Sequence, residues 1–258
     1  MRVCLLASGS KGNAVFVECG DSRILIDAGL SAREIERRLA EISVEPADLN
    51  AILVTHEHQD HIGAVGPLAR RYHLPVYLHP STHAVAKLGR LDAVCEFDTG
   101  TSFLLRNLQV TPFPVTHDAV ETVGFIIDSP AGRIGVATDL GIATRLVADR
   151  LRDCRVLVLE SNHDERMLRD GPYPWHLKQR IAGRHGHLSN TAAAELLTGL
   201  LWSGTEAVFL AHLSETNNDP RLAHQTTRTV LDRQNCCAPQ LFVGAQGTVS
   251  ACFDGRRA

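Results

Sequence analysis

A short apolar segment that leads directly into a cluster of histidines and acids constrains the fold of this chain more than any other feature. Residues 51–54 (Ala-Ile-Leu-Val) have the character of a buried strand, and residues 55–61 (Thr-His-Glu-His-Gln-Asp-His) follow at once. Histidine is the commonest metal-donating side chain near neutral pH, and a carboxylate adds an oxygen donor beside it. If these groups were buried for packing alone, each would need its own polar partner. The run therefore predicts a metal centre supported by the end of a strand.

The overall composition is that of an ordinary globular protein. The 258 residues include 26 basic and 29 acidic side chains, which gives a net charge of -3. This charge argues against a strongly basic surface that binds nucleic acid non-specifically, but it allows a local basic groove. No apolar stretch approaches the roughly 20 residues of a membrane span. The apolar stretch at the start, about five residues long, is shorter than the roughly 7–15 residues of a signal peptide. We therefore expect a cytoplasmic protein without a membrane segment, folded as a single domain over residues 1–258.

The seven cysteines are dispersed along the chain and form no C-x-x-C pair. Neither a zinc ribbon nor a disulfide framework is therefore predicted. Several cysteines fall inside strand-like runs, and we expect them to act as small buried hydrophobic residues in a reducing compartment.

Short apolar, β-branched runs alternate with helical segments along both halves of the chain. Strands are expected at residues 3–7, 14–19, 23–27, 51–55, 76–79, 108–115, 122–128, 133–138, 155–160, 207–211 and 248–253. Helices are expected after the capping box of Ser31 and Glu34 and at residues 61–72, 142–151, 190–202 and 219–234, with a loose tail at 254–258. This alternation predicts a sandwich of two mixed sheets flanked by helices.

Three further ligand candidates, His117, Asp139 and His212, each stand at the end of an apolar run. Taken alone, His117 or His212 is more simply explained as a hydrogen-bonded structural histidine. Asp139 could instead cap the helix expected to begin near Gly141. Three such positions, together with the run at 55–61, form a pattern that favours metal binding.

The order of these motifs resembles the metallo-β-lactamase fold family, in which an early Asp precedes His-x-His-x-Asp-His, His, Asp and His. Asp27, within residues 25–29 (Leu-Ile-Asp-Ala-Gly), is similar to the early Asp, and the resemblance covers essentially the whole chain. It implies an α/β, four-layer αββα sandwich with two pseudo-halves, and a site for two divalent metal ions. The ligands implied for the first ion are His56, His58 and His117. Those implied for the second are Asp60, His61 and His212. Asp139 would bridge the two ions, and Asp27 would brace the metal loop without ligating.

The ligand set implied by this resemblance favours phosphodiester hydrolysis. Members of the family that transfer electrons typically have an acid at the position of His58 and a fused flavin domain, and many β-lactam hydrolases lack a bridging aspartate. A His/Asp set bridged by Asp139 is similar to the phosphodiesterase and nuclease branch, with thioester hydrolases close behind. Two cations roughly 3.5–4 Å apart suit this chemistry, because they activate a bridging hydroxide and offset charge on the phosphoryl oxygens. Histidine donors favour zinc, although manganese or iron can occupy similar sites.

Downstream segments narrow the resemblance to one group of the family. Residues 160–164, 173–178, 186–190 and 211–214 are similar to the YycJ/VicX-like metal-dependent hydrolases, some of which are regarded as 5′-to-3′ exonucleases. Only 72 residues lie between Asp139 and His212, so the RNA-grasping β-CASP insertion of ribonuclease J-like enzymes is absent.

Four residues of these segments are candidates for contact with substrate. His187 would protonate the leaving oxygen as a general acid, while Asp60 would orient the hydroxide in addition to ligating. Ser189 or Asn190 could cap the following helix, and the N-terminus of that helix could also bind a phosphate group of the substrate. The two roles are compatible. His163 is a further candidate for substrate binding. The loop at 8–13 is most simply a turn between strands, and contact with substrate through Ser10, Lys11 or Asn13 is the alternative.

We therefore predict a dinuclear-metal-dependent hydrolase, a phosphodiesterase or nuclease of the 5′-to-3′ exonuclease kind, acting on nucleic acid or a small phosphodiester. Two alternatives stay open. One is a thioester or small cyclic-phosphate hydrolase that uses the same metals. The other is a metal-stabilised regulatory protein without turnover, against which the intact ligand set counts.

Overall fold

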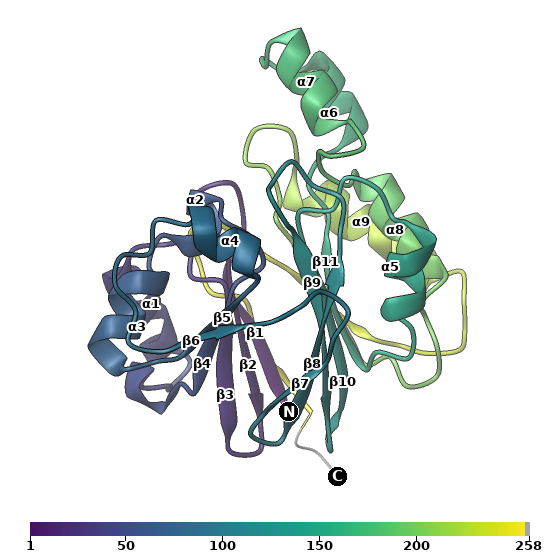
Figure 1. The fold of residues 1–258 in the computed structure, drawn as a ribbon. Coiled ribbons are helices and arrows are strands. Elements are labelled where there is room, and N and C mark those ends of the chain that lie inside the picture. The colour runs from purple at the N-terminus through teal and green to yellow at the C-terminus, as the bar shows by residue number, and fades with distance from the viewer. Residues whose placement is uncertain (256–258) are drawn as a thin grey trace.

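The computed structural model describes residues 1–255 as two seven-stranded mixed sheets packed face to face, with helices covering the outer faces (Figure 1). The strand order is β14-β1-β2-β3-β4-β5-β6 in the first sheet and β13-β12-β11-β10-β9-β8-β7 in the second. This arrangement confirms the predicted αββα sandwich. None of the helices in the described part has the length and apolar character needed to cross a lipid bilayer.

The first sheet is an antiparallel meander continued by parallel strands. Its strands are β1 (Arg2–Ala7), β2 (Ala14–Cys19), β3 (Ser22–Ile26), β4 (Ala51–Leu53), β5 (Val76–Leu78), β6 (Val94–Glu96) and β14 (Phe253–Asp254). Pairing is antiparallel from β14 to β3 and parallel from β3 to β6. The segments beside this sheet are α1 (Ala32–Glu41), the 3-10 turn η1 (Pro46–Asp48), α2 (Gln59–Ile62), α3 (Val65–Tyr72) and α4 (Pro80–Val85).

The second sheet repeats this plan. Its strands are β7 (Phe103–Leu105), β8 (Leu108–Pro114), β9 (Val123–Ser129), β10 (Gly132–Ala137), β11 (Val156–Glu160), β12 (Ala207–Ala211) and β13 (Gln240–Val243). Pairing is antiparallel from β7 to β10 and parallel from β10 to β13. The helices of this half are α5 (Arg145–Arg150), α6 (Glu165–Asp170), α7 (Trp175–Ile181), α8 (Asn190–Thr198) and α9 (Pro220–Leu231). In Figure 1, α6 and α7 project from the sandwich as an arm.

The core is divided between the sheets and the helices. One apolar cluster lies between the two sheets, and two more lie under the helices on the outer faces. Strands β11 and β12 are buried along their whole length, as expected for parallel strands covered on both faces. Because the carboxyl ends of parallel strands meet at one edge of a sheet, loops that follow β3, β4, β10, β11 and β12 can converge on a common site.

Several sequence-based expectations differ from the structure. The helix expected at 61–72 is interrupted, because Ala64 N donates to Ala28 O (2.7 Å) instead of continuing the helical ladder, so α2 and α3 are separate. The strand expected at 248–253 is found only as the two-residue strand β14. The loose tail expected from residue 254 is also wrong at its first residues, because Asp254 belongs to β14 and Gly255 N donates to Met1 O. The remainder of that tail, 256–258, lies outside the described residues. Short elements such as β13 and α7 were not predicted.

A disulfide joins Cys4 to Cys252, with Cα atoms 4.6 Å apart. This corrects the expectation that the cysteines are unpaired. The two residues are 248 positions apart, and only the return of the chain past β1 brings them together. Ser250 lies beside the same strand, where its N–H donates to Leu5 O and its hydroxyl accepts from Leu5 N. No local spacing could have indicated this pair.

Candidate metal centre

The predicted ligands gather at the edge of the sandwich where parallel strands of both sheets end. Asp27 follows β3, the histidine run follows β4, Asp139 lies two residues after β10, and His212 directly follows β12. Asp27, Asp139 and His212 all have a positive φ, between 55° and 61°. Non-glycine residues seldom adopt this conformation, and it persists where the surrounding structure over-determines it, often at functional sites.

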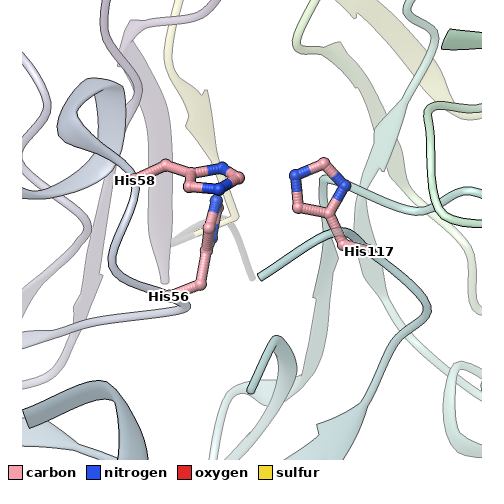
Figure 2. A group of neighbouring side chains, drawn as sticks. All are labelled: His56, His58 and His117. Atoms are coloured by element: carbon pink, nitrogen blue, oxygen red, sulfur yellow. The ribbon is translucent and has the colours of Figure 1, made fainter. Parts of the chain in front are cut away.

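The first group of donors consists of three histidines that face one another across the edge. One ligand atom each from His56, His58 and His117 lies within 4.8 Å of the others. Figure 2 shows His56 and His58 on one loop and the His117 ring turned toward them from the opposite side. His117 Nδ1–H donates to Gly186 O (3.1 Å), which leaves Nε2 directed into the site. This geometry suits a cation held between the two halves of the fold.

Hydrogen bonds fix the tautomer of His56. Thr55 Oγ1–H donates to Asp27 Oδ2 (2.8 Å), so the same hydroxyl oxygen must accept from His56 Nδ1–H (2.9 Å). The other ring nitrogen, His56 Nε2, is buried and has no hydrogen-bond partner among the described residues. Burial holds the pKa of His56 well below its usual value, so the ring is neutral. A buried neutral nitrogen without a partner is what a metal ligand requires.

The second group consists of Asp60, His61 and His212, whose ligand atoms also lie within 4.8 Å of one another. His61 Nδ1–H donates to Asp27 Oδ2 (2.7 Å), which directs His61 Nε2 toward the site. His212 Nε2 is buried without a hydrogen-bond partner in the described part of the chain. The two groups therefore differ in donor type, since only the second includes a carboxylate.

Asp139 lies between the two groups. Its Oδ2 is 3.2 Å from His61 Nε2, and its Oδ1 is 3.6 Å from His117 Nε2. Burial opposes ionisation of Asp139, but the charges of His212 and His61 outweigh that effect and hold its pKa well below the usual value. A buried carboxylate with one oxygen toward each histidine group has the position that a bridging ligand needs.

The donor set fits divalent cations. Burial disfavours the charged form of His212, yet Asp139, Asp60 and Glu160 raise its pKa to about 10. Without a cation, a proton on this ring offsets the charge of the buried carboxylates. Nitrogen and oxygen donors with unpartnered buried atoms indicate that a metal replaces such protons on binding.

Glu160 lies within the site, but no role was predicted for it from the sequence. It is fully buried at the end of β11, and its Oε1 accepts from both His187 Nδ1 and His212 Nδ1, each at 2.8 Å. Its Oε2 accepts from Leu140 N and Leu188 N. Burial works against the charge, but the two histidines hold the pKa of Glu160 at about 2. The sequence signal that could have identified Glu160 is an acidic residue at the end of an otherwise apolar strand. That strand lies between β10 and β12, which Asp139 and His212 follow.

Comparison with known proteins identifies the family. Residues 22–213 match the beta-lactamase superfamily domain. The chain belongs to the metallo-β-lactamase superfamily.

Two relatives match this superfamily member over nearly their full length. Exodeoxyribonuclease WalJ of Streptococcus pneumoniae serotype 2 is 39% identical over 231 residues, which cover 87% of this chain and 86% of the relative. Exodeoxyribonuclease YycJ of Bacillus anthracis is 35% identical over 247 residues, 94% of this chain and 93% of the relative. The structure of the metallo-beta-lactamase fold protein YhfI from Bacillus subtilis superposes with a TM-score of 0.73 at 15% identity, covering 96% and 98% of the two chains, and shows the fold alone.

His187 reaches the centre of this metallo-β-lactamase site from the loop before α8. Because its Nδ1–H donates to Glu160, the free nitrogen of the ring is Nε2. The ring centroid lies 5.0 Å from those of both His117 and His212, and a fifth of the side chain is exposed. His187 also lines the cleft that contains Asp60 and Asp139. It is therefore placed beside both groups of donors and within reach of solvent.

The other predicted substrate residues are buried. Ser189 caps α8 by accepting from Ala192 N, and it donates to Glu165 Oε1. Asn190 is buried and bonds to Ser161 and Asn218. The peptide group of His163 accepts from Asn190 N, and its side chain is buried. These contacts support the loop that carries His187. Direct contact of Ser189, Asn190 or His163 with substrate stays a prediction.

The loop at 8–13 joins β1 and β2, as expected, and it also supports the metal loop. Asn13 N donates to Asp60 O (2.8 Å), and Asn13 Nδ2 lies 3.1 Å from His61 Nε2. Ser8 Oγ accepts from His212 N (2.6 Å). This turn therefore connects ligand candidates from both sheets.

Substitution of Gly29 by alanine is expected to displace the metal loop. A Cβ at Gly29 would lie 1.6 Å from Asp60 O, a backbone atom that cannot move aside alone. We expect a loss of about 2–3 kcal/mol of unfolding free energy, a fall of about 5–10 °C in melting temperature, and less bound metal. Calorimetry and elemental analysis measure both effects.

Gly247→Ala is the matched control, because a Cβ there would meet no described atom within 4 Å. If Gly29→Ala and Gly247→Ala melt alike and hold equal amounts of metal, the close approach at Gly29 is wrong.

Proposed function

We propose that this protein is a divalent-metal-dependent exonuclease that hydrolyses phosphodiester bonds in DNA. The observation that carries the proposal is the buried carboxylate of Asp139 placed between two groups of histidine and aspartate donors. Relatives named exodeoxyribonucleases, which this chain matches over most of their length, support DNA as the substrate. We further propose that residues 1–258 act as one domain and that the metals are two zinc ions.

The proposed ligands follow the two geometric groups. His56, His58 and His117 would hold one ion, while Asp60, His61 and His212 would hold the other. Asp139 would contribute an oxygen to each. When bound, divalent cations supply water activation and neutralisation of phosphoryl charge at such a site.

Side chains of the protein would orient the attacking water molecule and protonate the departing oxygen. Asp60 has a partly exposed carboxylate that lines the cleft, where it can orient an attacking water molecule in addition to ligating. With its Nδ1–H bonded to Glu160, the doubly protonated ring of His187 would deliver its Nε2 proton to the departing oxygen of the cleaved bond. Asp27 fixes Thr55 and His61 without facing the cleft.

A three-substrate assay tests the proposed function. We expect the metal-loaded protein to release mononucleotides from 5′-phosphorylated DNA, to cleave bis-p-nitrophenyl phosphate slowly, and to leave an acyl-glutathione intact. Chelation should abolish turnover, and zinc, manganese or iron added singly should identify the active metal. Hydrolysis of the thioester without DNA cleavage would instead indicate a thioester hydrolase, and metal binding without any turnover would indicate a regulatory protein.

A further inference from the structure

The arm formed by α6 and α7 stands beside the metal centre and has an unusual surface for this chain. Every residue of α7 is at least partly exposed, and Trp175 is 68% exposed. Residues 165–187 contain five basic and two acidic residues, a net charge of +3, whereas the whole chain carries -3. A locally basic arm with an exposed aromatic ring is typical of a surface that contacts nucleic acid.

A cavity of about 350 Å³ lies between this arm and the sandwich. The arm contributes Tyr173, Leu177, Arg180 and Ile181 to its lining, and the sandwich contributes residues that include Asn162 and Ser214. The volume lies within the range of about 300–1,000 Å³ that is usual for small-ligand sites. The lining therefore combines aromatic and apolar side chains of the arm with polar side chains of the sandwich.

The cavity opens directly onto the metal cleft. Ser10, Asp118, Arg180 and His187 line both spaces. Arg180 stands at the boundary, where its Nε donates to Asp118 Oδ2 (2.5 Å) while 63% of its side chain stays exposed. A phosphodiester bound in the cleft would therefore have a cation at its side and an aromatic-lined cavity next to it.

We propose that this cavity binds one base of the nucleic-acid strand, adjacent to the phosphodiester being cleaved. Tyr173 would stack on the base, and Arg180 would contact the backbone phosphate at the boundary. The inference rests on the proposed nuclease function, and it assigns binding of the nucleic-acid strand to the α6–α7 arm. Because every base presents a π-face, stacking of this kind should give little sequence preference.

Oligonucleotides that lack one base test the assignment directly. Two 5′-phosphorylated substrates would carry an abasic residue on one or the other side of the scissile bond, and each would be compared with the intact oligonucleotide. For the wild-type protein, one abasic position should lower kcat/KM by about 10- to 100-fold, the usual effect of losing one stacked base. For Tyr173→Ala the ratio between intact and abasic substrates should fall close to 1, whereas Tyr173→Phe should keep most of the wild-type ratio.

A salt titration tests Arg180 separately. Arg180→Ala should raise KM for DNA and reduce the slope of log KM against log salt concentration by about 0.7–0.9, the contribution of one phosphate contact. Arg71→Ala is the matched control, since Arg71 is also an ion-paired arginine, with 57% of its side chain exposed, on α3. Arg71→Ala should leave the slope unchanged.

Different results would overturn the nuclease function and the assignment of the cavity. No DNA hydrolysis by the wild-type protein overturns both the nuclease function and the cavity assignment. DNA hydrolysis with equal ratios for wild type and Tyr173→Ala overturns the cavity assignment alone. Melting temperatures of all variants should match wild type, because Tyr173 and Arg180 lie outside the apolar clusters of the core.

Discussion

Replacement of Asp139 by alanine is expected to lower kcat/KM for DNA by at least ~10³-fold, which corresponds to about 4 kcal/mol of transition-state stabilisation. The physical reason is its position, with one oxygen 3.2 Å from His61 Nε2 and the other 3.6 Å from His117 Nε2. Removing the carboxylate leaves the imidazole groups on both sides without a shared anion. Elemental analysis should show that most of the metal at the site proposed for Asp60, His61 and His212 is lost.

Asp128→Ala is the control for this variant. Asp128 lies on β9 of the same sheet, and its carboxylate is 42% exposed and faces Arg133. It should keep wild-type turnover and metal content. An Asp139→Ala protein that remains active with two bound ions would contradict the bridging role.

Glu160→Gln should produce the second largest loss, at least ~100-fold in kcat/KM. One carboxylate oxygen of Glu160 accepts from both His187 and His212, and the neutral amide removes the charge that holds both rings. Loss of a residue that orients a metal ligand typically weakens metal affinity by about 10- to 100-fold. If His187 is the general acid, as proposed, loss of its orientation adds a separate decrease of about 10²- to 10⁴-fold in the chemical step.

Metal titration separates these two consequences. Excess metal should refill the proposed metal site at His212, while the proposed contribution of His187 stays lost, so rescue of Glu160→Gln should be partial. Glu206→Gln applies the same substitution to an exposed, ion-paired glutamate at the other end of β12 and should behave as wild type. Full rescue by metal would show that Glu160 does not position His187.

The local pattern of the sequence predicted the strands that carry the site. Residues 51–54 and 207–211 are apolar without interruption, because parallel strands in a sandwich are covered on both faces, and the structure places β4 and β12 there. The short helices of the arm were not predicted, for the opposite reason. No residue of α7 is buried, so the helix has no apolar stripe at helical spacing that a sequence pattern could reveal.

The sequence by itself determined which donor types this protein has and in which order they follow the strands. It also placed the chain in a family, because the motif run at 55–61 and the later His117, Asp139 and His212 are local features. Only the tertiary structure decided which of these donors face one another. It also revealed that Glu160 joins His187 to His212, that Cys4 meets Cys252, and that an arm walls a cavity beside the metal cleft. The reason is physical: periodicity and caps depend on near neighbours, whereas these contacts join residues that become adjacent only when both sheets pack.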